Sequence, residues 1–444
     1  MLNPAMAKPI VAALIRAVLG CAAAVLSFDA LAAPATNLLY TFRGKADGGS
    51  PEGGVILGQG GVIYGTADRY GTNDSGTVFC LTPPVTAGGA WSFRVLYHFT
   101  GGADGGYPLG LVQDDAGDLF GYTLDGGIGS GTVFMLQKPA TPGAGWRFHT
   151  IYQLQGGADG AAPSGIVLRA DGSLMVAADR GGGRGQCRDP IVGSLVGCGV
   201  VLQLNRPARK GESWIETVLH RFSGGADGAT PAGSPILLDG AYYGTTSEGG
   251  GGNCTQPGTA TVAGCGAVYR LRQTQPGTWV EEVPYSFAGG ASGWTPAGGL
   301  AADAQGNLYG AAAFGGLDGD AGYGNGLVYK LTPNPAGSFT QSVLHFFAGG
   351  NDGFDPDAGV VLDRKGRIYS TTYLGTSSHL GSVFVLTPPT ISGGTWKETI
   401  RAEFSGDKGA YPTGQLALDK TNAIYGVALQ GGRFNKGTVY RVTP

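Results

Sequence analysis

Aspartate recurs at one position of a glycine-rich turn throughout the sequence. The stretch "LHRFSGGADGATPAG" at residues 219–233 has close relatives that begin at Leu96, Tyr285 and Leu344. The aspartates of these turns are Asp47, Asp104, Asp159, Asp227, Asp352 and, slightly displaced, Asp407. A ring of carboxylates would bind a cation or a sugar, whereas an Asp that bonds its own backbone, with Gly and Pro after it, builds a turn. We favour the structural role, because a motif repeated along the chain is typical of what forms each unit.

Side chains suited to catalysis are few and scattered. The candidates are Arg69, Tyr70, Arg180, Tyr373 and His379. They come from three different units and need not meet, although an enzyme needs a base and a charge stabiliser that converge. The other four histidines fall in predicted outer strands and are interpreted as packing residues: His98, His149, His220 and His345. No G-x-S-x-G, H-E-x-x-H or P-loop motif is present.

Signals for a metal ion are weak. The loop "LDGDAGYGNG", with Asp318 and Asp320, resembles a calcium loop. It lacks the bidentate Glu that completes such a loop. We therefore predict no cofactor, and calcium is the alternative.

The cysteines predict two local disulfides. Cys187 and Cys198 share the C-x10-C spacing of Cys254 and Cys265, and each pair ends in Cys-Gly. A bridge across each pair would constrain the unfolded chain by roughly 3 kcal/mol. Zinc is the rival interpretation, but no His lies at ligand spacing. Cys80 remains, and we interpret it as a buried thiol.

The composition favours a protein of short strands and many turns. The chain has 444 residues, of which 84 are glycine, and 42% are hydrophobic. Its net charge is −3 and it has no run of basic residues. A nucleic-acid partner would require a basic face, so we expect none, and anionic membranes are disfavoured for the same reason. We expect a monomer.

The first 33 residues resemble a secretory signal peptide. Lys8 and Arg16 precede an apolar run, "AVLGCAAAVLSF", and small residues at Ala30 and Ala32 follow. The run is too short for a comfortable transmembrane span. Cys21 ends "VLGC", a loose match to a lipoprotein cleavage box, but the apolar run continues past it. We expect an exported protein, periplasmic, extracellular or at the cell surface, without a transmembrane span in the mature chain.

One unit repeats seven times over residues 34–444. The Pro that ends each turn falls at Pro51, Pro108, Pro163, Pro231, Pro296, Pro356 and Pro412. The units begin near residues 38, 95, 151, 219, 285, 344 and 401. Each contains four apolar runs joined by Gly, Pro, Asp and Asn turns, which predicts a four-stranded antiparallel meander.

A repeat of this size with four strands is typical of a propeller blade. The last unit stops after its third strand, at "GTVYRVTP", and Leu38–Phe42 resembles a fourth strand without the preceding three. We therefore predict one all-β domain, a seven-bladed β-propeller in which this N-terminal strand pairs beside Gly437–Val442. A straight solenoid is the alternative, but it would need capping units.

The pattern "F-x-G-G-x-D-G-x-x-P … D-x-x-G-N-L-Y-G … G-T-V-F-x-L-T-P" resembles the choice-of-anchor tandem repeat GloVer-containing proteins of bacteria. The similarity covers nearly all of the chain after residue 33. Unit three departs from the pattern by losing its aromatics, and unit five has Ser292 in place of the turn Asp. The resemblance implies an exported repeat protein and implies no reaction, because the family is defined by its repeat.

The units differ most between their second and third strands, and loops that vary on a rigid scaffold commonly carry function. We therefore expect a binding or interaction module for a glycan or a protein. The alternatives are a propeller enzyme, such as a polysaccharide lyase or lactonase, and a purely structural surface protein.

Overall fold

The structure is a computed structural model. It describes residues 36–443 except 87, 142, 189–193, 210, 255–261, 317–322 and 392. The predicted signal peptide, with Cys21, and the loop aspartates Asp318 and Asp320 lie outside the described residues. Short strands and the turns that join them make up most of the described chain.

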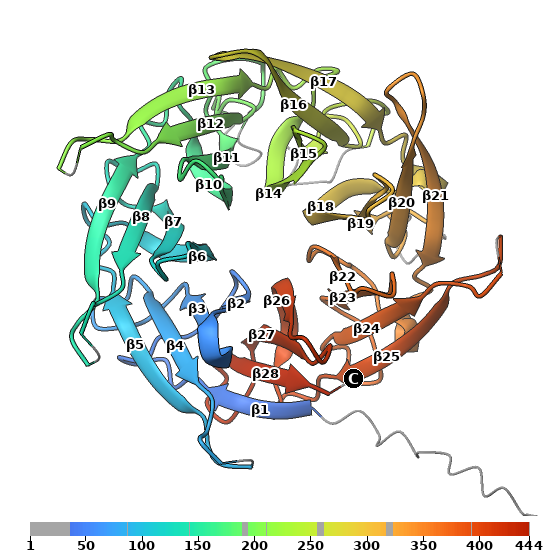
Figure 1. The fold of residues 1–444 in the computed structure, drawn as a ribbon. Helices are drawn as coiled ribbons and strands as arrows, with labels where there is room; N and C mark the ends of the chain where they lie inside the picture. Colours follow the sequence, from blue (N-terminus) through green and yellow to red (C-terminus); the bar gives the residue numbers. More distant parts are fainter. Residues whose placement is uncertain are drawn as a thin grey trace, which may run out of the picture. The chain divides into compact units, whose positions relative to one another are not determined.

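Seven four-stranded antiparallel sheets form a ring, which is the predicted β-propeller (Figure 1). Blades 1 to 3 consist of β2 (Val55–Leu57), β3 (Ile63–Ala67), β4 (Thr77–Thr82) and β5 (Ser92–His98); β6 (Gly106–Gln113), β7 (Leu119–Asp125), β8 (Thr132–Gln137) and β9 (Arg147–Gln153); and β10 (Ala161–Leu168), β11 (Leu174–Arg180), β12 (Val200–Asn205) and β13 (Ile215–Arg221).

Blades 4 to 7 continue the same order. They consist of β14 (Ala229–Leu238), β15 (Ala241–Glu248), β16 (Ala267–Gln275) and β17 (Thr278–Ser286); β18 (Trp294–Ala302), β19 (Leu308–Phe314), β20 (Leu327–Pro333) and β21 (Phe339–Phe346); β22 (Val361–Leu362), β23 (Ile368–Thr372), β24 (Ser382–Thr387) and β25 (Lys397–Glu403); and β26 (Ala410–Leu418), β27 (Ile424–Gln430), β28 (Thr438–Val442) and β1 (Thr36–Thr41). Short 3-10 turns are η1 (Gln59–Gly61), η2 (Gly290–Ser292) and η4 (Gly350–Asp352).

The N-terminal strand closes the ring, as the sequence predicts. β1 pairs antiparallel with β28 (Figure 1), and in this pairing Leu38 lies opposite Tyr440. Phe42, which follows β1, is fully buried. Blade 7 therefore takes three strands from the C-terminal end and one from the N-terminal end.

Aromatic side chains pack between neighbouring blades. A Phe after the outer strand of one blade meets, edge to face, a Phe or Tyr on the third strand of the next, as in Phe42–Phe79 and Phe287–Tyr329. The centroids in these two pairs are 5.3 and 5.1 Å apart. Burial of each ring contributes roughly 1.5–3 kcal/mol. The recurring aromatics therefore form the core between blades.

Both predicted disulfides are present. Cys187 is bonded to Cys198, and Cys254 to Cys265. Cys80 is a buried free thiol on β4.

Within the part of the chain that is described, no helix has the length and apolar character needed to cross a bilayer.

Candidate functional site: the acidic mouth of the channel

A cavity lies where the inner strands of all seven blades converge. Its volume is about 570 Å³, and residues of β2, β6, β10, β14, β18, β22 and β26 line it. Glu52, Tyr122 and Asp357 contribute polar groups to this wall. A central cavity framed by rigid strands is a common ligand site in a fold of this kind.

Glycines narrow the channel because the blades converge toward the axis. A Cβ on Gly298 would lie 2.1 Å from the backbone nitrogen of Gly359, and one on Gly233 would lie 2.5 Å from the carbonyl carbon of Gly298. Both glycines also have positive φ, 61° and 69°. The inner strands therefore touch backbone to backbone at these positions.

One end of the channel is ringed by residues with left-handed backbone. In every blade the residue before the turn proline has positive φ although it is not glycine: Ser50, Tyr107, Ala162, Thr230, Thr295, Asp355 and Tyr411. Such a conformation costs a non-glycine residue roughly 1–2 kcal/mol. The rest of each blade compensates this strain, so the chain path at the rim is fixed while the side chain varies.

Four carboxyl groups gather at this rim. Glu52 and Asp357 each follow the turn proline, in blades 1 and 6, and Asp355 precedes that proline in blade 6. Asp68 follows β3, which runs antiparallel to β2, so it lies at the same end of blade 1. Its backbone nitrogen donates to the Ser50 carbonyl oxygen at 3.3 Å.

The environment favours the neutral form of these acids. Burial, together with the charges of Asp355 and Glu52, raises the pKa of Asp357 to about 8. Burial and the charge of Glu52 raise the pKa of Asp68 to about 7, and burial raises the pKa of Asp355 to about 6. Burial also raises the pKa of Glu52. The charge of Glu52 therefore acts on both Asp68 and Asp357, and the charge of Asp355 acts on Asp357.

Two of these carboxylates have an oxygen without a partner. Asp68 is only 5% exposed, and its Oδ1 makes no hydrogen bond. Oδ1 of Asp357 is likewise buried and unpaired. Buried polar atoms are almost always hydrogen-bonded, so the unpaired oxygen of Asp357, which lines the cavity, indicates where a ligand would bind.

Tyrosines and one arginine complete the rim in blades 6, 7, 1 and 2. The rings of Tyr373 and Tyr411 stack at 5.1 Å. The guanidinium of Arg69 lies 5.6 Å from the ring centroid of Tyr107 and 3.5 Å from Asp68 Oδ2. A backbone hydrogen bond connects Tyr373 to the acidic residues of the rim, because Tyr373 N donates to Asp355 O at 2.9 Å.

Comparison with known proteins identifies the repeat that builds this site. A family model described as the Gloeobacter/Verrucomicrobia repeat matches residues 24–260 and 255–444. The chain belongs to this repeat family. The match confirms the resemblance seen in the sequence, and the repeats account for the strands and turns that carry the rim.

Two solved structures are similar to the chain at low sequence identity. PorZ, a surface component of the type-IX secretion system of Porphyromonas gingivalis, has a TM-score of 0.48 and 14% identity over 86% of this chain and 46% of its own. The chain thus spans about half the length of PorZ. A luciferin-regenerating enzyme has a TM-score of 0.43 and 14% identity over 76% of this chain and 91% of its own. Curated protein sequences give no match.

The structure brings together only part of the catalytic set considered from the sequence. Arg69 and Tyr373 both lie within the electrostatic reach of Glu52. Tyr70 instead accepts a 2.7 Å hydrogen bond from the Nζ of Lys436. Arg180 is next to Asp179 in blade 3, and its charge lowers the pKa of that group against the effect of burial, which raises it to about 7.

His379 lines a different cavity. This cavity of about 730 Å³ lies between the loops of blades 5 and 6, and Tyr323 and Asn325 form part of its wall. Asp355 contributes to the same wall. His379 is therefore a neighbour of the channel mouth and does not lie within it.

The turn aspartates hold their own turns. Asp104 Oδ2 accepts hydrogen bonds from the Tyr97 hydroxyl at 2.9 Å and from Thr100 N at 2.9 Å. The same pattern recurs at Asp47, Asp159, Asp227 and Asp352, with His replacing Tyr for the last two. Asp407 lies in the turn between Gly406 and Gly409, and Ala402 occupies the Tyr position there. This geometry supports the structural interpretation that we favour for the turns.

The sequence did contain a signal for the acids that we overlooked. Glu52 and Asp357 occupy the position after the turn proline, where the other five units carry Leu109, Ser164, Ala232, Ala297 and Thr413. A comparison of the units position by position would have singled them out. The sequence does not show that Glu52 and Asp357 approach each other across the axis, because this proximity depends on the closed ring of blades.

Proposed function

We propose that this protein is an exported binding module, and that the acidic channel mouth takes a positively charged group of a glycan or protein ligand. The observation that carries the proposal is that Glu52 and Asp357 line the channel cavity, with Asp68 and Asp355 at the same rim and unpaired oxygens on Asp68 and Asp357. Arg69 offsets part of this negative charge.

An ammonium group suits this arrangement. It donates three hydrogen bonds, and carboxylates are its strongest acceptors. A cation also interacts favourably with tyrosine rings within about 6 Å, and the stacked pair of Tyr373 and Tyr411 lies at the same rim. An amino sugar or a lysine side chain supplies such a group.

Export is the setting that the disulfides support. Two bridges are present in the fold, and disulfides persist in oxidising compartments outside the cytosol. The apolar segment near Cys21 supports the same proposal from the sequence alone.

The test compares ligands that differ only in charge. Isothermal titration calorimetry would use glucosamine oligomers and N-acetylglucosamine oligomers of equal length, and a lysine peptide against its acetylated form. We expect only the charged member of at least one pair to bind, more weakly at high salt. Asp357→Asn and Glu52→Gln should each weaken binding about tenfold or more, because each removes a carboxyl group that a bound ammonium would hold in its charged form.

A matched control is Asp115→Asn, which changes an exposed carboxylate in the turn between β6 and β7, at the other end of the channel. It should leave affinity unchanged. Equal binding of the acetylated ligands, or full affinity in Asp357→Asn, would contradict the proposal.

A catalytic alternative is favoured by one observation, the raised pKa values of Asp68 and Asp357 beside a cavity. A carboxyl group that titrates near neutral pH can act as a general acid. Turnover of uronic-acid polymers or lactones, abolished by Tyr373→Phe or Asp357→Asn, would support a lyase or lactonase. His379→Ala should then change activity less, because His379 lies outside the channel mouth.

A further inference from the structure

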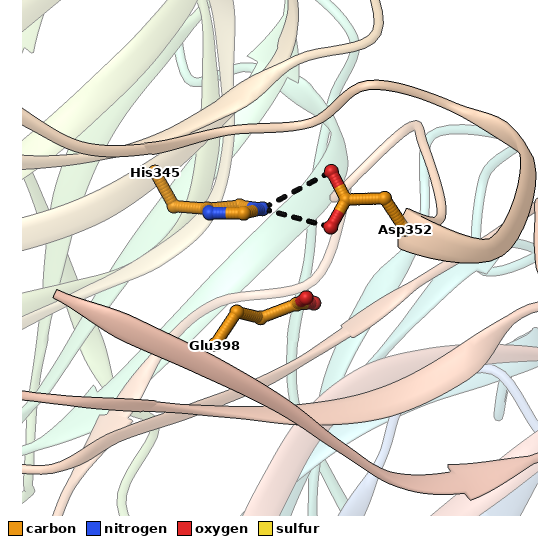
Figure 2. A group of neighbouring side chains, drawn as sticks. All are labelled: His345, Asp352 and Glu398. Carbon is orange, nitrogen blue, oxygen red and sulfur yellow. Dashed lines mark hydrogen bonds and ion pairs between the residues drawn. The ribbon is translucent and has the colours of Figure 1, made fainter.

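Three metal-ligating side chains converge at the outer junction of blades 5 and 6. His345 is on β21, Asp352 ends η4 in the turn between the blades, and Glu398 is on β25. Their candidate ligand atoms all lie within 4.8 Å of one another, and Figure 2 shows the three side chains directed toward a common point. The junction is remote from the channel because both strands are the outermost of their blades.

We propose that His345, Asp352 and Glu398 form a binding site for a divalent transition-metal cation of the zinc class. One imidazole nitrogen and two carboxylate oxygens are ligands that Zn²⁺ accepts, with water in the fourth position. With bonds of about 2.1 Å, ligand atoms of a tetrahedral site lie roughly 3.4 Å apart. Nε2 of His345 is 3.2 Å from Oδ1 and 3.3 Å from Oδ2 of Asp352.

Two of the ligands are already held in place. The His345 ring packs edge to face on Phe347, with centroids 4.8 Å apart. Asp352 Oδ2 accepts a 2.6 Å hydrogen bond from Ala348 N. A site whose ligands are fixed by their neighbours needs little reorganisation to bind a cation.

Glu398 supplies the third candidate ligand, and Glu216 and Glu281 at other junctions share its unpaired Oε1. Oε1 of Glu398 is buried and makes no hydrogen bond. A cation between the two carboxyl groups would pair this oxygen.

The equivalent positions in other blades show what this junction would be without a metal function. Tyr40 stacks on Phe93 at 3.8 Å, and Tyr97 stacks on Phe148 at 4.1 Å. The Tyr285 hydroxyl donates to Gln341 Oε1 at 2.9 Å. Asp352 holds its turn as the other turn aspartates do, but packing or one neutral hydrogen bond suffices between the blades, so His345 and Glu398 are not required by the fold.

A second junction has the same residue types with a looser arrangement. His220 Nε2 is 3.3 Å from Asp227 Oδ2, and Glu281 is the matching residue on β17. Among the described residues only the group around His345 brings three ligand atoms within 4.8 Å. We therefore assign the cation to the blade 5 and 6 junction.

The experiment is a Zn²⁺ titration of the protein without a polyhistidine tag, by calorimetry and by metal analysis after dialysis. We expect a single equivalent to bind. Co²⁺ in its place should give the visible absorption bands of a low-coordinate site with nitrogen and oxygen ligands. Binding should also raise the melting temperature, because the cation binds only the folded chain.

The variants use substitutions that the chain itself accepts at the same positions. His345→Tyr copies Tyr40, Tyr97, Tyr152 and Tyr285, and Glu398→Gln copies Gln341. His345→Tyr should lose the bound equivalent, and Glu398→Gln should weaken binding at least about tenfold. Glu216→Gln, the matching change on β13 beside Tyr152, is the control and should bind as the parent does.

Two results would overturn the site. One is failure of the parent protein to bind Zn²⁺ or Co²⁺ up to millimolar concentrations. The other is unchanged stoichiometry and spectrum in His345→Tyr, which would assign the cation to another place, such as the channel mouth. The acetylation test of the channel ligand is independent of either result.

Discussion

The buried carboxyl group of Asp68 shows that an acid at the channel mouth can lower the stability of the folded chain. It is 5% exposed, lies beside Glu52 and has an unpaired oxygen. An unfolded Asp has a pKa of about 3.9, whereas burial raises that of folded Asp68 to about 7. Between these values the folded chain holds a proton that the unfolded chain has released. The free energy of unfolding therefore falls as pH rises from about 4 to 7.

We expect Asp68→Asn to reduce this dependence on pH. The amide keeps the shape of the side chain and cannot become charged, so the variant should gain on the order of 1 kcal/mol or more over the parent at pH 8, relative to pH 5. Urea unfolding at the two pH values measures the difference. Asp115→Asn, in an exposed turn, should follow the parent at both. Parallel curves for Asp68→Asn and the parent would show that Asp68 titrates normally.

At the scale of the strand, glycine sets how closely neighbouring blades approach. The inner strands β18 and β22 belong to adjacent blades, and Gly298 at the first contacts Gly359 just before the second. Only a residue without Cβ fits where the two backbones touch. The high glycine content thus serves two needs, since other glycines provide the positive φ of tight turns.

A matched pair of alanine substitutions separates the effect of close backbone contact from the effect of positive φ. Gly298→Ala and Gly240→Ala both place alanine at positive φ, 61° and 76°. A Cβ on Gly240 meets nothing within 4 Å, whereas one on Gly298 would lie 2.1 Å from Gly359 N. Gly240→Ala should cost about 1 kcal/mol, and Gly298→Ala about 2 kcal/mol more because of the overlap. Thermal unfolding of the two variants gives the comparison, and equal losses would exclude the close backbone contact.

At the scale of the whole molecule, the ring depends on one short strand. β1 covers the free edge of β28, and Phe42 fills the core beside Phe79 of blade 1. Without this strand, blade 7 would expose unpaired backbone groups, which favours association with other chains. The closure therefore protects the seam between the first and last units.

A chain that begins at Arg43 should be less stable and should self-associate, compared with one that begins at Pro34. Both lack the predicted signal peptide, so they differ only in the closing strand and its immediate flank. Melting temperature and light scattering would report the two effects. A synthetic peptide of residues 34–42 should restore part of the stability by re-forming the pair with β28. A shorter chain that remains monomeric with the same melting temperature would show that the strand is dispensable.

The sequence by itself determined the blades, their number, both disulfides and the closing strand. These features are local or periodic: turn residues recur at fixed places, strands alternate, and each cysteine pair spans one loop. The sequence also drew attention to Arg69 and Tyr373, because they lie in variable loops. From the sequence we interpret His345 as a packing residue, and in the fold its ring packs against Phe347.

Only the tertiary structure decided which of these residues meet. Glu52 and Asp357 are about 300 residues apart in the chain, and they approach because seven wedges share one axis. Glu398 reaches His345 and Asp352 because neighbouring blades pack against each other through their side chains. Local patterns specify each strand and turn, but the distance between side chains of different blades depends on how the whole ring closes.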